Sequence, residues 1–128
     1  DKMAYVVGST QVDDSAAEAF AKDSGVCQDF VHIFLACCRH LQVPARYISG
    51  YTYNWDKQNL SSHAWAEAWI SNRWLTFDVA YGFTSPDKHL RLAMGLDYLE
   101  ACPVRGVRWG GEGESLTAFA EVELMGAE

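Results

Sequence analysis

The chain is poor in basic residues and has no run of them. Ten Lys and Arg stand against seventeen Asp and Glu, which gives a net charge of −7. An acidic surplus without a basic patch argues against a nucleic-acid backbone or an anionic membrane surface as the main partner. The sequence also lacks an apolar stretch of membrane-spanning length, a secretory leader and a lipidation motif. We therefore expect neither nucleic acid nor membrane among its partners.

The four cysteines form no CxxC pair, and two of them are adjacent. Cys37 and Cys38 fall inside a predicted helix, where they cannot bridge each other without strain. The string CCRH suggests metal ligands, but successive helix positions point in different directions, so core packing is the better interpretation. No DxDxDG calcium loop is present. We expect no metal, no cofactor and a reducing, cytoplasmic location.

The length and composition indicate a single domain. With 128 residues, of which 49% are hydrophobic, the chain can bury a proper core without disulfides. It contains no internal repeat and no low-complexity linker. The first residue is Asp1 rather than Met, so we interpret residues 1–128 as one domain of a longer protein, and the missing leader carries little weight.

Two helices are predicted. Ser15-Ala-Ala-Glu18 matches a capping box that starts a short helix ending at about Lys22, after a short extended segment within residues 1–13. A second helix is predicted from Cys27 to about Leu41, before Pro44. Its apolar residues cover most of the helix circumference, which is typical of a helix buried inside a domain. These residues are Phe30, Val31, Ile33, Phe34, Leu35, Cys37, Cys38 and Leu41.

The rest of the chain is predicted to be mainly strands. Three strands are expected over residues 46–53, 63–70 and 73–80, with a loop over 54–62, an irregular segment running to about Gly113, and a final strand over 115–124. In HAWAEAWI, period-two alternation puts His63 and the tryptophans on one face and three alanines on the other, a flat surface for a close-packed helix. The chain therefore predicts an α+β fold with a central buried helix packed on an antiparallel sheet.

The candidate chemistry starts at Cys27, where a glycine turn leads into the second helix. A helix start exposes unpaired N–H groups and the positive end of the macrodipole, which stabilise an anion such as a thiolate. A neighbouring imidazole would complete an activated nucleophile. His63 is the natural base, and Asp78 could orient it. If Ser71-Asn72 forms a two-residue loop, Trp65 pairs with Asp78, and the Cα atoms of His63 and Asp78 become diagonal neighbours roughly 7–8 Å apart. A three-residue loop would separate their side chains, and we predict the two-residue loop.

The run GVCQDFVHIFLACCRHLQVPARYISGY, followed by HAWAEAWI and RWLTFDVA, resembles the core of the bacterial transglutaminase-like superfamily, often described as cysteine proteases of papain-like fold. The resemblance begins at about Tyr5 and extends through AMGLDYLEACPVRGVRWGG to the closing strand. It implies a nucleophile at Cys27, an imidazole at His63 and an acid at Asp78. One departure is Val79, because the family usually has proline after the acid. Family members commonly carry a separate N-terminal domain, which fits the abrupt start.

The resemblance implies thiol-dependent acyl transfer on peptide or isopeptide amides. Cys27 would attack the carbonyl, His63 would protonate the departing amine, and water or a second amine would resolve the thioester. Water makes the protein a hydrolase, and an amine makes it a transglutaminase. The Cys27 backbone N–H would be one oxyanion donor, and Gln11, Gln28 and Tyr5 are weak candidates for the second. No tryptophan precedes Cys27, so the indole donor that animal transglutaminases use is not available within this chain.

Several readings stay open at this point. A binding or scaffold module that kept the fold without turnover is the alternative function. Asp29 is expected to cap the helix or pair with Arg46, and His89 to lie in an exposed loop unless it lines the cleft. Trp65 and Trp69 are the tryptophans expected to meet the substrate.

Overall fold

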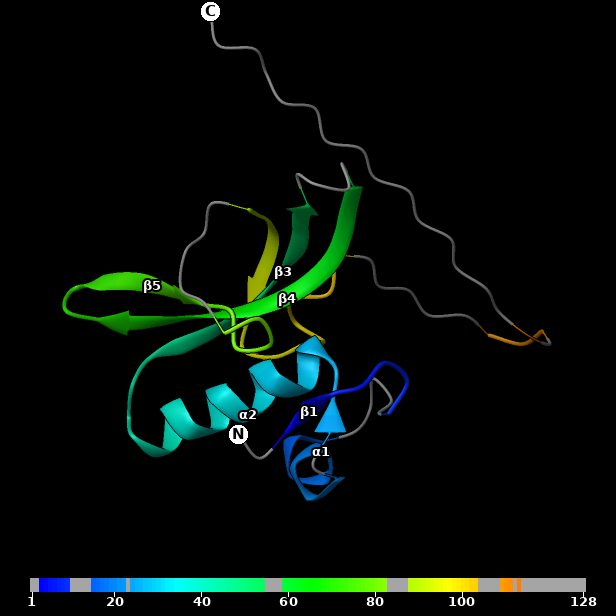
Figure 1. Cartoon of the computed structure of the whole chain (residues 1–128), viewed down its shortest axis with the longest axis horizontal. Helices are drawn as coiled ribbons and strands as arrows, with labels where there is room; N and C mark the ends of the chain where they lie inside the picture. The colour runs from blue at the N-terminus through cyan, green and yellow to red at the C-terminus, as the bar shows by residue number, and fades with distance from the viewer. Residues whose placement is uncertain are drawn as a thin grey trace, which may run out of the picture.

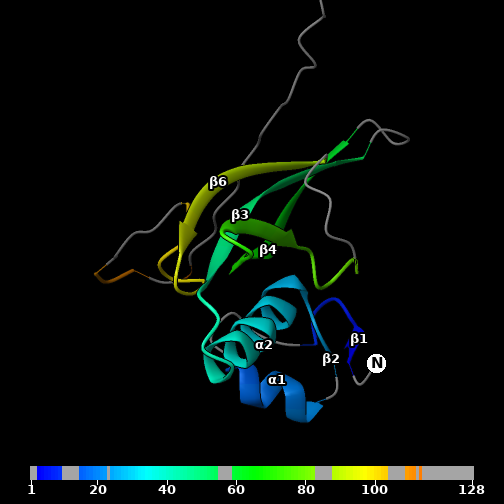
Figure 2. The same ribbon diagram turned by 90° about the vertical axis from the view of Figure 1, so that its left-hand side faces the viewer.

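A computed structural model describes residues 3–9, 15–22, 24–54, 59–82, 88–103, 109–111 and 113. A four-stranded sheet, the helix α2 and the helix α1 follow one another in layers, and the short strands β1 and β2 lie beside the start of α2 (Figures 1 and 2). The elements in chain order are β1 (Ala4–Tyr5), α1 (Ala16–Lys22), β2 (Ser24–Gly25), α2 (Cys27–His40), β3 (Ala45–Asn54), β4 (Asn59–Ile70), β5 (Arg73–Phe77) and β6 (His89–Gly95). The predicted α+β class is confirmed.

The two helices begin and end close to where the sequence predicts. The Ser15 N–H donates to Glu18 Oε2 at 2.6 Å and the Glu18 N–H donates to Ser15 Oγ at 3.2 Å, which is a reciprocal capping box. At the start of α2, Asp29 Oδ2 accepts the Val26 N–H at 2.8 Å, so Asp29 is the expected cap. The suggested pairing of Asp29 with Arg46 is wrong, because Arg46 instead pairs with Glu67 at 2.6 Å.

The helix α2 is buried on the side that faces the sheet and exposed at its last turns. Val31 and Leu35 are fully buried and pack against Ala64 and Ala66 of β4, and Ala68 is also fully buried. The predicted alanine face is therefore confirmed, and its small side chains let the helix approach the strand closely. Burial around the whole helix is not observed: Cys38 is buried, whereas Cys37 and His40 are exposed.

The sheet has the strand order β5-β4-β3-β6, and all of its neighbours are antiparallel. The strand β4 begins at Asn59, so residues 59–62, predicted as loop, pair with β3. Ser61 and Ser62 are exposed polar residues, and hydrogen bonds between backbones rather than side-chain burial make them part of the strand. The strand β6 lies within the segment predicted to be irregular. The predicted strand over 115–124 lies outside the described residues.

The edge strand β6 meets β3 at an irregularity between Ser49 and Gly50. A Cβ at Gly50 would collide with the backbone carbonyl oxygen of Leu90 and lie 2.8 Å from the ring of Trp65, so glycine is required by this close approach. Leu90 and Leu92 of β6 are about half exposed, at 46% and 49%. An edge strand with exposed leucines lacks the clean apolar alternation that identifies strands from sequence. In the part of the chain that is described, neither helix has the length and apolar character needed to cross a bilayer.

Candidate active site

The turn between β4 and β5 determines how His63 meets Asp78. Ser71 and Asn72 have φ angles of 54° and 64°, the left-handed conformation that a two-residue hairpin loop of type I′ requires. The register runs from Ile70 opposite Arg73 to Ala66 opposite Phe77, and one further step puts Trp65 opposite Asp78. The predicted register is confirmed. His63 Nε2 lies 2.8 Å from Asp78 Oδ2, and both side chains are almost completely buried.

Cys27 is the first residue of α2, and it lines one cavity together with His63. The cavity has a volume of about 280 Å³, and its walls include Tyr47, Tyr98 and Cys102. The Cys27 thiol is in hydrogen-bond contact with the His63 ring. Because His63 Nε2 faces Asp78, Nδ1 is the ring atom left for Cys27. The structure thus brings together the three residues that the sequence singles out.

The charges of His63 and Asp78 stabilise each other. Burial by itself lowers the pKa of His63, but the hydrogen bonds and negative charges of Asp78 and Cys27 outweigh it and raise that pKa to about 9. Burial acts to raise the pKa of Asp78, but hydrogen bonds from His63 and His89 together with the charge on His63 outweigh it and hold that pKa below its ordinary value. At neutral pH the imidazole is therefore protonated beside an ionised carboxylate.

His89 is the residue of this site whose position the sequence interpretation missed. The prediction of an exposed loop histidine is wrong, because His89 begins β6 and only 2% of its side chain is exposed. Its Nε2 lies 2.8 Å from the same Asp78 Oδ2 that contacts His63. The Tyr81 N–H donates to Asp78 Oδ1 at 3.2 Å, so both carboxylate oxygens are engaged. Asp78 is consequently fixed from three sides.

Among the described residues, His63, Asp78 and His89 are the group that could hold a metal ion, since their ligand atoms lie within 4.8 Å of one another. Two imidazoles and a carboxylate are suitable zinc ligands. The same atoms are already joined by two hydrogen bonds of 2.8 Å, which account for the geometry by themselves.

Aromatic rings enclose the imidazole of His63. The Tyr81 ring stacks on it, with centroids 4.3 Å apart and planes at 11°. Trp65 packs at 6.2 Å from His63 and edge-on to His89 at 4.6 Å. The prediction that Trp65 and Trp69 meet the substrate is not supported. Trp65 is only 2% exposed, and Trp69 packs on Trp74 beside the hairpin turn.

Tyr5 contacts the backbone that would form the oxyanion site. It lies opposite Gly25 in the β1–β2 pair, and its ring stacks on Phe30 at 6.0 Å. Its phenol oxygen accepts a hydrogen bond from the backbone of Cys27. Burial and the nearby Cys27 raise the pKa of the phenol, so Tyr5 keeps its proton at neutral pH and can donate it in a hydrogen bond. Of the other candidate donors, Gln28 is buried beside Cys27, and Gln11 lies outside the described residues.

Known proteins resemble this chain in sequence and in fold. The family model of the transglutaminase-like superfamily matches residues 1–79. The uncharacterized protein ML0607 of Mycobacterium leprae is 30% identical over 132 residues, which cover 97% of this chain and 46% of that protein. The uncharacterized protein YebA of Bacillus subtilis is 29% identical over 80 residues, which cover 52% of this chain and 11% of YebA.

A solved structure described as a putative cysteine protease from Cytophaga hutchinsonii is similar with a TM-score of 0.69 and 34% identity. The similarity covers 79% of this chain and 34% of that one, so the chain spans less than half of these relatives. The predicted papain-like architecture is confirmed, and a thiol-dependent, cysteine protease-like enzyme is supported. By the match of its family model, the chain belongs to the transglutaminase-like superfamily.

Proposed function

We propose that this domain catalyses thiol-dependent acyl transfer on peptide or isopeptide amides. Cys27 is the nucleophile, His63 the acid and base, and Asp78 the residue that orients and stabilises the imidazolium. The observation that carries the proposal is the continuous contact from the Cys27 thiol through the His63 ring to Asp78, at the wall of a cavity. Family membership and the likeness to a cysteine protease support the same chemistry.

The reaction proceeds in two halves. The Cys27 sulfur attacks the amide carbonyl carbon, and the carbonyl oxygen becomes an oxyanion beside the Cys27 backbone N–H. His63 then gives its proton to the departing amine as the C–N bond breaks, leaving a thioester on Cys27. In the second half His63 takes a proton from water, the resulting hydroxide attacks the thioester, and the thiolate and imidazolium are restored with release of the acid.

Tyr5 is proposed as the second oxyanion donor. In the resting site its phenol oxygen accepts from the Cys27 backbone. When an oxyanion forms, the phenol O–H and the Cys27 N–H can both turn to it, which gives two donors of the kind that acyl-transfer sites use.

Water is the proposed acyl acceptor, and an amine is the alternative that would make the protein a transglutaminase. The cysteine protease description of the Cytophaga hutchinsonii protein favours hydrolysis. The substrate is proposed to be a peptide or protein. We further propose that residues 1–128 act as one domain, in the cytoplasm, without nucleic acid or membrane as a partner.

The proposal is tested by alkylation with iodoacetamide, monitored by peptide mapping. Cys27 is expected to react faster at pH 6.5 than Cys102, which lines the same cavity, and His63→Ala should remove the difference. His40→Ala, at an exposed position on α2, is the matched control and should leave it unchanged. Equal rates at Cys27 and Cys102 would instead favour a scaffold without turnover.

Screening peptides and amines by intact mass then tests the acyl transfer itself. A thioester intermediate appears as a mass increase on the protein that maps to Cys27. Its loss in buffer alone identifies water as the acceptor, and faster loss with transfer to added amine identifies transamidation. A substrate that is cleaved equally well by Cys27→Ala would contradict the assigned nucleophile.

A further inference from the structure

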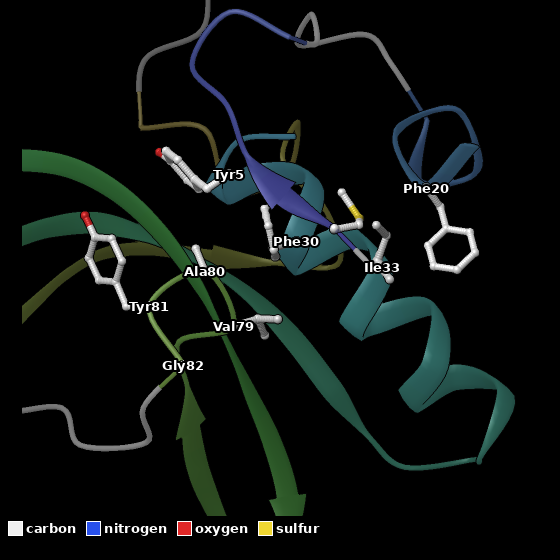
Figure 3. A pocket seen from close by; sticks show the side chains of 9 residues that line it. Tyr5, Phe20, Phe30, Ile33, Val79, Ala80, Tyr81 and Gly82 are labelled. Atoms are coloured by element: carbon white, nitrogen blue, oxygen red, sulfur yellow. The ribbon is translucent and has the colours of Figure 1, made fainter. Parts of the chain in front are cut away.

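A second cavity, of about 450 Å³, lies between the helices and the segment that follows β5. Its walls come from β1, α1, α2 and residues 79–82, and none of the lining side chains carries a charge. Figure 3 shows Phe20 and Ile33 on the helix side, with Tyr81 and Val79 opposite them. The volume falls within the range of pockets that hold small ligands.

This cavity borders the proposed active site through two tyrosines. The Tyr5 oxygen accepts the hydrogen bond from the backbone of Cys27, and the Tyr81 ring stacks on His63. Both tyrosines also line the cavity. Tyr5 and Tyr81 are thus shared between the lining of this cavity and the surroundings of Cys27 and His63.

Part of the cavity wall remains open to solvent. Phe20 is 42% exposed, Tyr5 46% and Tyr81 51%, which is a large exposure for aromatic side chains that line one cavity. Covering such surface with apolar atoms is favourable, whereas a charged group would lose its hydration there without gaining an ionic partner among the lining side chains. The uncharged lining therefore favours binding of an apolar group.

We propose that this cavity is the subsite for an uncharged apolar side chain of the peptide substrate, next to the amide that Cys27 attacks. The inference rests on the proposed acyl-transfer function and names the substrate class for it. The occupant is an aliphatic or aromatic side chain, because the lining is uncharged and mostly apolar and because two of its residues, Tyr5 and Tyr81, contact Cys27 and His63. Each methylene buried there is expected to favour binding about fourfold.

The experiment uses alkylating probes that need no known substrate. Iodoacetamide, N-hexyl-iodoacetamide, N-phenethyl-iodoacetamide and N-(2-carboxyethyl)-iodoacetamide are reacted with the protein, and the second-order rate constants at Cys27 and Cys102 are measured by peptide mapping. Division by the Cys102 rate removes differences in intrinsic probe reactivity. The rate constant at Cys27, divided by that at Cys102, is expected to be at least about tenfold higher for the hexyl or phenethyl probe than for iodoacetamide. We call this increase the apolar gain. The carboxyethyl probe is expected to show no increase.

Variants locate the source of the preference. Phe20→Glu places a charge in the cavity wall at a position that is already 42% exposed, so folding should survive. It is expected to reduce the apolar gain to below about threefold. Leu41→Glu introduces the same charge at a residue that is 71% exposed and does not line the cavity, and it should keep the full gain.

The outcomes separate the two proposals. Equal reactivity of Cys27 and Cys102 toward plain iodoacetamide counts against the acyl-transfer function, whatever the apolar probes do. A fast Cys27 without an apolar gain, or with a gain that Phe20→Glu leaves intact, overturns the subsite alone. Light scattering could show a dimer that Phe20→Glu dissociates, while neither protein shows the apolar gain. That result would assign the cavity to a second copy of the chain and would also overturn the subsite.

Discussion

The proton on His63 stabilises the folded state, and removing it by raising the pH should weaken the fold. The pKa of His63 is about 9 in the fold against an ordinary value of 6.5. Because the folded state binds the proton more tightly, the stabilisation is complete below pH 6.5 and is lost as the pH rises through 9. The difference of about 2.5 pKa units corresponds to roughly 3 kcal/mol at 1.36 kcal/mol per unit. The side chain is only 1% exposed, so screening by solvent reduces this little.

The assay is urea unfolding, monitored by tryptophan fluorescence at fixed pH values between 6 and 10. The free energy of unfolding of the natural chain is expected to fall across this range by about 2–3 kcal/mol more than that of His63→Gln. The difference between the two proteins removes the contribution of other titrating groups. His40→Gln, exposed on α2, should follow the natural chain. A His63→Gln profile parallel to that of the natural chain from pH 6.5 to 9 would refute the reasoning.

Three further predictions concern the residues around the imidazole. Asp78→Asn should slow acyl-enzyme formation on Cys27 by about 10²–10⁴-fold, measured by intact mass with an amide found in the screen, because the imidazolium loses its buried counter-charge; a rate within twofold of the natural chain would remove Asp78 from the mechanism. His89→Ala should lower the same rate on the order of tenfold, and His89→Gln, whose amide can still donate to Asp78, should recover most of it; if both variants lose activity equally, the hydrogen bond to Asp78 is not the cause. Dialysis against EDTA should leave the rate of Cys27 alkylation unchanged, because the Nε2 atoms of His63 and His89 are already hydrogen-bonded to Asp78, and slower alkylation that zinc restores would show that a metal is required.

Local rules were sufficient for the central part of the site. The number of residues in a hairpin turn determines which residues of its two strands lie on the same face of the sheet. The two-residue turn Ser71-Asn72 was therefore enough to predict that His63 and Asp78 share a face. The start of α2 at Cys27 was predicted from Gly25 and the run of apolar residues that follows it, although Ser24–Gly25 forms the strand β2 rather than a turn. Neither inference requires knowledge of which distant strands pair.

The position of His89 depends on a contact that no local pattern encodes. It reaches Asp78 because β6 pairs with β3, a strand about forty residues earlier in the chain, with Thr52 opposite His89. The exposed leucines of this edge strand obscure its alternation. Trp65 was misassigned for a related reason, since β6 covers the face that would be open in an isolated hairpin and His89 packs edge-on against its ring.

The alanine face of β4 has a consequence for how this enzyme core can change. Cys27 belongs to the helix layer and His63 to the sheet layer, so the thickness of the side chains between the layers sets the gap across which sulfur and imidazole meet. Replacing Ala66 by valine is expected to push the layers apart and to lengthen the distance between the sulfur and the imidazole, although neither reactive residue is itself substituted. Volume in this part of the core is thus tied to reactivity as well as to folding, and the chain has little freedom to repack there.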